Sequence, residues 1–362
     1  MLKTRCTILL IGVCATLCGQ GNQPAGDGFA LLTTPYSERP LQLYRGQLQG
    51  NAGYLFGVRT KLFDGSGRNV HTKDVISETH RFSWEVKYGI TDFLEVETGS
   101  MFARTNVLSI EEIYPVSDET LAYVETLEEH RGFTDWYLGA SLRLPRAYRH
   151  FDLSVGGGVY LPVAAYKSKE PQHTFSVDAY EAPAEIHLNY HRTYPNGTGV
   201  PVFRLATAVK ATAGRFAFQG SGRLLFPARE AVNIRWRDSV TGTGSFSSAY
   251  ASEGEEYALL PNRTLNVDAV LHYRVNGWFD AYLGGAYLRA AGGWTEYYGD
   301  RYATPAERLT ALTAGFSIQA SPNLVIYETT TFPLSGKNTD GMFQVSLTAS
   351  FNLFPFLKNS AP

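Results

Sequence analysis

Residues 81–97 read RFSWEVKYGITDFLEVE and contain two alternating runs separated by a short turn. In the first run, apolar residues such as Phe82 and Trp84 alternate with polar ones. In the second run, Leu94 and Val96 alternate with glutamates. A period of two places successive side chains on opposite faces of a β-strand. This stretch is therefore predicted to form a β-hairpin with one apolar face and one polar face.

Short turns of this kind recur along the chain, and longer polar stretches separate the hairpins that they close. The short turns are predicted at residues 89–92, 145–150, 213–215, 275–277 and 321–323. The long stretches lie at residues 64–77, 107–130, 164–199, 227–262 and 289–306. Tight turns on one side and long loops on the other are typical of outer-membrane β-barrels, whose turns face the periplasm.

Alternation predicts about twelve strands, from residues 42–63 at the start to residues 343–353 at the end. Most of these runs exceed ten residues, and a tilted strand needs roughly 9–11 residues to cross a bilayer. Strands of soluble β-sandwiches are usually shorter. An even number of strands also returns both termini to the periplasmic side. The predicted fold is therefore all-β, an antiparallel transmembrane β-barrel with short periplasmic turns and long extracellular loops.

Some segments leave the strand count open between twelve and fourteen. Residues 185–191 and 232–237 also alternate, so they are either extensions of the barrel wall above the membrane or additional strands. The first strand is unusually long, and residues 49–52 could form a turn within it. The strand at residues 324–332 is the weakest prediction, because Glu328 shares the parity of the apolar residues.

The start of the chain fits a secretory signal peptide. Lys3 and Arg5 precede an apolar stretch at residues 8–17, which is too short to span a bilayer as a helix. The predicted organisation is a signal peptide at residues 1–21, a periplasmic segment at 22–40, the outer-membrane barrel at 41–354 and a C-terminal tail at 355–362. The expected location is the outer membrane of a Gram-negative cell.

All three cysteines, Cys6, Cys14 and Cys18, lie within this leader. Cleavage removes them, so no disulfide, thiolate metal site or cysteine nucleophile is expected. Lipid attachment at Cys18 is the alternative, which Leu17 disfavours because such sites usually carry a small residue before the cysteine. Loss of the two basic leader residues moves the formal charge from −2 to −4. This near-neutral charge argues against nucleic-acid binding.

The polar face of the hairpins is expected to line the lumen, because a charge on the lipid face costs ~2–4 kcal/mol at the midplane. Opposed charges flank three short turns, and they pair Lys87 with Glu95, Arg143 with Asp152 and Arg274 with Asp280. The predicted lumen or constriction residues are Arg81, Glu85, Lys87, Glu95, Glu97, Arg143, Asp152, Arg223, Asp268, Arg274 and Asp280. Their ion pairs would fill a narrow barrel, select solutes, or do both.

Patterns for catalysis and metal binding are weak. No histidine is followed two residues later by serine, as in an outer-membrane phospholipase, and no GxSxG, HExxH or P-loop pattern occurs. His187 and His191 share a strand face, but histidines in loops are more often solvated. Residues 156–158 are three glycines inside a strand, where they relieve bending or make room for a bulky neighbour. We therefore expect no enzyme, no cofactor and no metal.

Two short phrases resemble a known family. Residues 88–96 (YGITDFLEV) are similar to its strand–turn–strand phrase, and residues 332–336 (FPLSG) are similar to its closing hairpin. The family is the group of outer-membrane transporters associated with the meta-pathway of phenol degradation. The resemblance implies a monomeric channel for small solutes, hydrophobic or aromatic molecules among them. It transfers no substrate-binding residue, and it does not cover the long loops at residues 164–199 and 227–262.

The main functional hypothesis is passive passage of a small solute through the barrel, with that solute and the outer-membrane lipid as partners. The alternative is a non-conducting barrel whose extracellular loops contact a partner or surface. A soluble secreted β domain is a third possibility, which a need for detergent and heat-modifiable gel migration would exclude. Alternation is the same in an open and a sealed barrel, so sequence leaves the first two hypotheses open.

Overall fold

The protein is described by a computed structural model that covers residues 41–352 with gaps. The gaps are residues 42, 44, 71–74, 118–119, 145–149, 164–171, 180–184, 195–199, 229–231, 241–249, 260–262, 298–299 and 322. The backbone alone is described at residues 75, 109–126, 128, 130, 172–179, 185–194, 232–240, 250–259, 294–297, 300–302 and 304. The predicted signal peptide, periplasmic segment and C-terminal tail lie outside the described residues.

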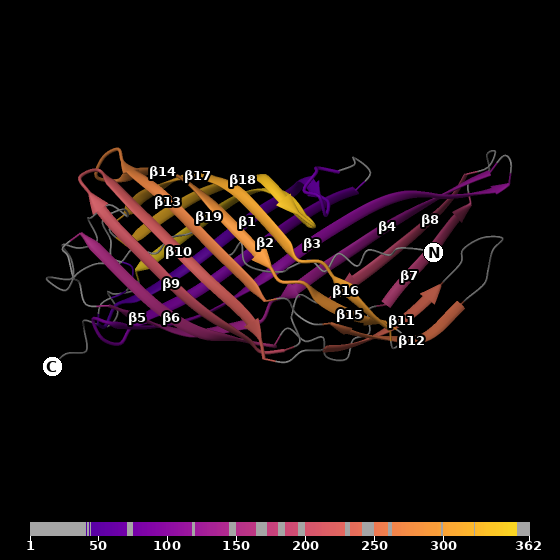
Figure 1. The fold of residues 1–362 in the computed structure, drawn as a ribbon, viewed down its shortest axis with the longest axis horizontal. Coiled ribbons are helices and arrows are strands. Elements are labelled where there is room, and N and C mark those ends of the chain that lie inside the picture. Colours follow the sequence, from indigo (N-terminus) through magenta and orange to yellow (C-terminus); the bar gives the residue numbers. More distant parts are fainter. Residues whose placement is uncertain are drawn as a thin grey trace.

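Twelve antiparallel strands form a closed barrel (Figure 1). In order around the wall they are β1 (Leu48–Phe63), β2 (Val75–Gly89), β3 (Leu94–Ser117), β5 (Trp136–Arg143), β6 (Phe151–Leu161), β9 (Val202–Ala213), β10 (Phe216–Pro227), β13 (Thr264–Arg274), β14 (Phe279–Ala290), β17 (Glu307–Ser321), β18 (Leu324–Lys337) and β19 (Thr339–Asn352). The barrel closes where β1 pairs with β19, with Phe56 opposite Val345. The prediction of a twelve-stranded barrel is confirmed.

Further strands extend the wall beyond one end of the barrel, on the side of the long connections (Figure 1). They are β4 (Thr120–Phe133), β7 (Gln172–Ala179), β8 (Glu185–Tyr194), β11 (Val232–Val240), β12 (Tyr250–Leu259), β15 (Gly293–Tyr297) and β16 (Asp300–Thr304). β8 pairs in parallel with β4, and β11 pairs in parallel with β7. The alternating segments 185–191 and 232–237 are thus extensions above the barrel and not additional barrel strands.

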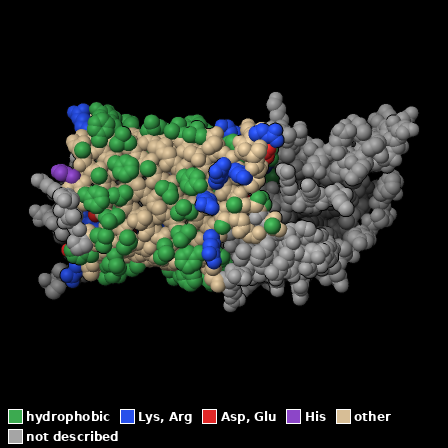
Figure 2. Space-filling model, viewed as in Figure 1, with side chains coloured by type: hydrophobic (Ala, Val, Ile, Leu, Met, Phe, Trp, Pro, Cys, Tyr) green, Lys and Arg blue, Asp and Glu red, His purple; other side chains and the backbone are tan. Residues whose placement is uncertain are grey.

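The barrel has a polar inside and an apolar outside. Outward residues such as Phe82, Leu283 and Leu347 are more than half exposed, whereas inward Thr79 and Thr313 have no exposed surface. The space-filling view shows hydrophobic side chains spread over the wall (Figure 2). Because a water-soluble protein buries such residues, this distribution belongs to a barrel surrounded by lipid. Among the described residues, no helix is long and apolar enough to span a membrane.

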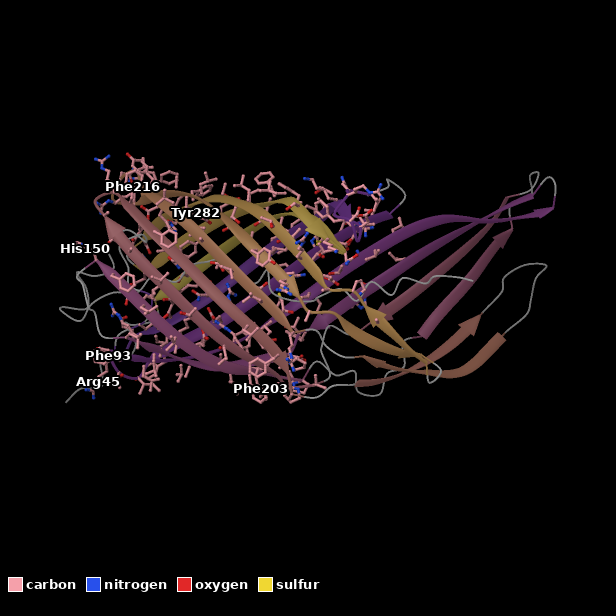
Figure 3. All side chains as sticks on the ribbon, in the orientation of Figure 1. Arg45, Phe93, His150, Phe203, Phe216 and Tyr282 are labelled. Atoms are coloured by element: carbon pink, nitrogen blue, oxygen red, sulfur yellow. The ribbon has the colours of Figure 1, made fainter. Side chains whose placement is uncertain are left out.

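Aromatic side chains mark both edges of the apolar wall. Phe216 packs against Tyr273 next to the short turns, with ring centroids 5.2 Å apart. Phe203 on β9 packs against Phe226 at the opposite end of β10, with ring centroids 5.6 Å apart. The labelled Phe216 and Phe203 lie at opposite ends of the barrel (Figure 3). Aromatic girdles of this kind lie at the two membrane interfaces of outer-membrane barrels.

Three local expectations are corrected or refined. β1 begins at Leu48, not at residue 42, and residues 49–52 lie within it because each is paired on both sides by β19 and β2. In β18, Val325 and Tyr327 are buried inside the barrel, so Glu328 faces outward. The Thr330 hydroxyl donates to the Glu328 carboxylate at 2.6 Å, which offsets part of the cost of that position.

Candidate functional site in the barrel lumen

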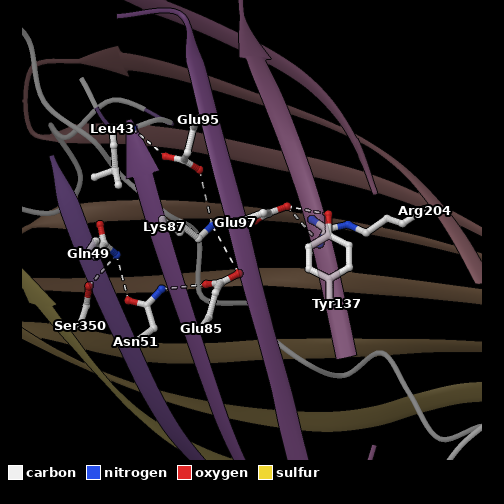
Figure 4. Close-up of polar contacts among 10 residues, drawn as sticks. All are labelled: Leu43, Gln49, Asn51, Glu85, Lys87, Glu95, Glu97, Tyr137, Arg204 and Ser350. Atoms are coloured by element: carbon white, nitrogen blue, oxygen red, sulfur yellow. Dashed lines mark hydrogen bonds and ion pairs between the residues drawn. The ribbon is translucent and has the colours of Figure 1, made fainter. Parts of the chain in front are cut away.

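A buried cluster of charges lies in the lumen near the short turns, and Figure 4 shows its contacts. Lys87 Nζ lies 3.0 Å from Glu97, 3.5 Å from Glu85 and 3.8 Å from Glu95. Lys87 and Glu95 are each only 1% exposed. The predicted Lys87–Glu95 pair is therefore present, but Glu97 is the nearer partner. The reason is register, because Lys87 is directly opposite Glu97 while Glu95 is opposite Gly89.

Glu97 connects this cluster to strands on the other side of β3. The Tyr137 hydroxyl donates to Glu97 at 2.7 Å, and Arg204 Nη1 lies 3.4 Å from the same carboxylate oxygen. The Arg204 guanidinium also lies over the Tyr137 ring, 4.7 Å from its centroid. Cation–π contact and ion pairing thus hold the same arginine. Tyr137 and Arg204 are not among the site residues predicted from the sequence, although alternation places Arg204 on the inward face of its strand.

Glu85 connects the cluster to the closure of the barrel. Asn51 Nδ2 donates to Glu85 at 2.8 Å, and Gln49 Nε2 donates to Asn51 at 2.9 Å and to Ser350 at 2.7 Å (Figure 4). A belt of polar contacts therefore runs from β19 through β1, β2, β3 and β5 to β9. Such a network stabilises the wall and occupies the lumen at the same level.

The chain that precedes β1 is bound to this part of the lumen through its backbone. The amide of Leu43 donates to Glu95 at 2.8 Å, and the amide of Leu41 donates to Asp152 at 2.9 Å. Both leucines are only 5% exposed. Residue patterns do not reveal this contact, because any residue except proline has the same amide donor.

One other predicted ion pair, Arg143 with Asp152, is present, and the predicted lumen residues Arg223 and Asp268 form an ion pair that was not predicted. Arg143 Nε lies 2.7 Å from Asp152, which confirms that pair. Arg223 Nη2 lies 3.6 Å from Asp268, which also accepts a hydrogen bond from Ser221 at 2.7 Å.

Two further predicted lumen residues, Arg274 and Asp280, face each other across the hairpin of β13 and β14. Arg274 and Asp280 are opposite each other in register, and one Arg274 guanidinium nitrogen lies 3.4 Å from the carbonyl oxygen of Gly214. Arg81 is buried inside the barrel at 6% exposure. All eleven predicted residues thus lie on strands of the barrel wall. Their role in solute passage stays a prediction.

Tyr137 fills the lumen next to two glycines. A Cβ on Gly158 would lie 2.6 Å from the Tyr137 ring, and a Cβ on Gly139 would clash with the Tyr137 hydroxyl. Tyr160 packs against the same ring, with centroids 4.8 Å apart. The expectation that the glycines at 156–158 make room for a bulky neighbour is met at Gly158.

Substituting Gly139→Ala should destabilise the barrel by about 1–3 kcal/mol, because the new methyl group pushes Tyr137 away from Glu97. All three atoms nearest to that methyl position belong to the Tyr137 side chain. Urea unfolding in detergent, followed by tryptophan fluorescence, measures the change. The variant Gly139→Ala/Tyr137→Ala is the control, since removing the ring should abolish the extra cost of the methyl group. Equal costs in both backgrounds would contradict this packing.

Metal ligands are not gathered at this site. In the parts of the chain with described side chains, no group of three or more His, Cys, Asp or Glu residues is arranged to hold a metal ion. The side chains of His187 and His191 lie outside those parts, so their metal binding is untested.

Comparison with solved structures identifies the class of barrel. The chain is similar to an outer-membrane channel from Pseudomonas putida F1, with a TM-score of 0.56 and 13% identity over 85% of this chain and 96% of that chain. The fold is that of an outer-membrane β-barrel. At this identity the likeness shows the fold alone.

Other solved barrels are less similar. The CymD monoaromatic hydrocarbon channel has a TM-score of 0.42 and 10% identity over 92% of this chain and 94% of that chain. A toluene transporter from Ralstonia pickettii has a TM-score of 0.38 and 9% identity over 85% of this chain and 90% of that chain. These scores are too low to support an argument about this chain. No protein-family model matches the sequence, and no curated protein does.

Proposed function

We propose that the protein is a channel for a small solute, with a lumen that is constricted in its periplasmic half. The observation that carries this proposal is the anchoring of Leu41 and Leu43 to Asp152 and Glu95. If the lumen carboxylates served only to stabilise the barrel, ion pairs across neighbouring strands would be sufficient partners for them. Here carboxylates of the lumen also hold Leu41 and Leu43, which precede β1 and belong to none of the barrel strands.

The charge cluster and this segment together make the constriction. Lys87, Glu95 and Asp152 have almost no exposed surface, so water does not reach them in this conformation. Passage past this level therefore requires Leu41 and Leu43 to move. Hydrogen bonds from amides to carboxylates are stronger than neutral ones, so they can hold the segment in place until a solute displaces it.

Removal of this segment should raise conductance. A variant lacking residues 22–44 loses both anchoring leucines, while a matched variant lacking residues 22–40 keeps them. Single-channel recording of the refolded proteins in planar bilayers should show higher conductance for the first variant than for the second or the full-length mature chain. Equal conductance in the two variants would contradict the constriction. No conductance in any of the three would exclude a channel.

A non-conducting barrel is the second candidate, and the burial of inward side chains on many strands favours it. Inward residues on many strands are buried, including Thr105, Lys210, Asp280 and Thr313 at 2% or less. The extracellular extension from β4 to β16 would then be the functional part. The same recordings decide between the two candidates.

The class of solute is also a proposal. The resemblance of residues 88–96 and 332–336 to the phenol-pathway transporters favours hydrophobic or aromatic molecules. The stacked Tyr137 and Tyr160 rings offer an aromatic face in the lumen, whereas the surrounding charges favour polar solutes. Liposome swelling with matched sugars and aromatic acids distinguishes these solutes. A monomeric state and the lack of enzymatic activity stay predictions.

A further inference from the structure

The outer face of the barrel carries a row of three cations at its extracellular edge. Arg289 on β14 is directly opposite Arg308 on β17, and Arg308 is directly opposite Lys337 on β18. The two arginines are exposed and Lys337 is half-buried. Figure 2 shows Lys and Arg side chains gathered at this end of the wall, next to the hydrophobic surface. Arg263, which precedes β13 and lies opposite Ala291, adds a fourth cation next to Arg289.

Parity places this cationic row on the lipid-facing surface. Tyr287 precedes Arg289 on the outward face of β14, and Leu312 follows Arg308 on the outward face of β17. Both side chains are 37% exposed. Phe332 lies outward on β18 at 41% exposure, and the register shift around Leu334 changes the alternation so that Lys337 lies on the same outward face, opposite Arg308. The cations therefore begin where the apolar wall and its aromatic girdle end. This is the level at which lipid headgroups contact the barrel.

Like charges directly opposite each other in a sheet destabilise it, because their Cβ atoms are only about 4.5–5.5 Å apart. The same barrel shows how such a pair is compensated elsewhere. Arg104 on β3 is opposite Arg131 on β4, and Glu129 lies 3.0 Å from the first and 3.7 Å from the second. Among the described residues, no acidic side chain forms an ion pair with Arg289, Arg308 or Lys337.

We propose that the cationic row binds the phosphate groups of the phosphorylated glycolipid in the outer leaflet. The row lies at headgroup level, and guanidinium groups bind phosphate oxygens through two parallel hydrogen bonds. The strand pairing on both sides of Arg308 fixes the spacing of the three cations. The side chain of Asn338 donates to the carbonyl of Ala306 at 3.0 Å, which holds the chain next to Lys337. The site is thus formed before the lipid binds, and it does not depend on whether the lumen conducts.

The test is a titration of the detergent-solubilised full-length protein with diphosphoryl lipid A, followed by native mass spectrometry. The triple variant Arg289→Gln/Arg308→Gln/Lys337→Gln should bind about a hundredfold more weakly, since each basic residue near an anionic lipid surface contributes roughly fivefold. The matched control Arg104→Gln/Arg131→Gln removes two cations that share the Glu129 carboxylate, a group with a net charge of only +1, so it should weaken binding by no more than about fivefold. Heat-modifiable gel migration verifies folding.

Three results would overturn the proposal. Unchanged affinity in the triple variant would exclude the cationic row, and equal binding of dephosphorylated lipid A would assign the binding to the acyl chains. Displacement by inorganic phosphate at the same concentration as lipid A would assign the site to free phosphate. If the triple variant does not fold, Arg308→Gln alone is used. It should weaken binding about fivefold, and an unchanged affinity would again overturn the proposal.

Discussion

The variant Lys87→Met is expected to lose about 3–5 kcal/mol of unfolding free energy, because it leaves a buried group of carboxylates without its central cation. Glu85, Glu95 and Glu97 lie within 3.8 Å of the Lys87 ammonium group. Their mutual repulsion is strong at this depth, since the surrounding side chains exclude water. Urea unfolding in detergent micelles measures the loss, with gel migration of unheated samples as a second readout.

Two further variants test the cause. Lys87→Met/Glu95→Gln removes one negative charge as well, so it should recover part of the lost stability. Arg68→Met removes an exposed ion pair to Asp64, whose distance of 3.3 Å falls in the same range. That change should cost about 0–1 kcal/mol, as exposed pairs do. A similar cost for Lys87→Met and Arg68→Met would show that the lumen cluster is solvated and not buried.

A charge placed on the outward face at mid-wall is expected to cost about 2–4 kcal/mol. Leu283 is 56% exposed and lies opposite Leu271 and Ala314, between the short turn at residues 275–278 and the rim at Ala290. The variant Leu283→Arg therefore places its charge near the bilayer midplane. Unfolding from phospholipid vesicles should show this loss of stability.

The matched variant is Leu144→Arg at the end of β5. Leu144 is also outward, at 41% exposure, but it lies next to the periplasmic turn, where an arginine reaches the headgroups. Its cost should be about 0–1 kcal/mol. Equal costs for the two substitutions would mean that the wall does not face lipid at the depth assigned here.

Most of the fold could be predicted from the sequence, because every barrel strand repeats the same local pattern, an alternation of apolar outward residues with polar inward ones. The hairpin at residues 81–97 shows this, since Phe82 and Leu94 face outward and Lys87 and Glu95 face inward. One segment shows the limit of the rule. Residues 185–191 alternate as clearly as a barrel strand, yet they pair in parallel with β4 above the barrel. Period two indicates a strand, but it carries no information about the neighbour of that strand.

The candidate site was predicted in part for the same reason. Alternation placed Lys87 and Glu97 inside the barrel. Their ion pair depends on the register of β2 against β3, which is set by the number of turn residues that take no part in the strand pairing. Arg204 reaches Glu97 from β9, and the Leu43 amide reaches Glu95 from outside the wall. These contacts join residues that are far apart in the chain, so no local pattern indicates them.

By itself, the sequence determined the membrane-spanning strands, their two faces and the sides on which turns and long connections lie. These properties follow from alternation and from the cost of placing polar groups in lipid. The tertiary structure alone decided the closure at twelve strands, the contacts that side chains make inside the lumen and the cationic row on β14, β17 and β18. Each of those depends on register between strands that are distant in sequence, and register is set by the assembled barrel.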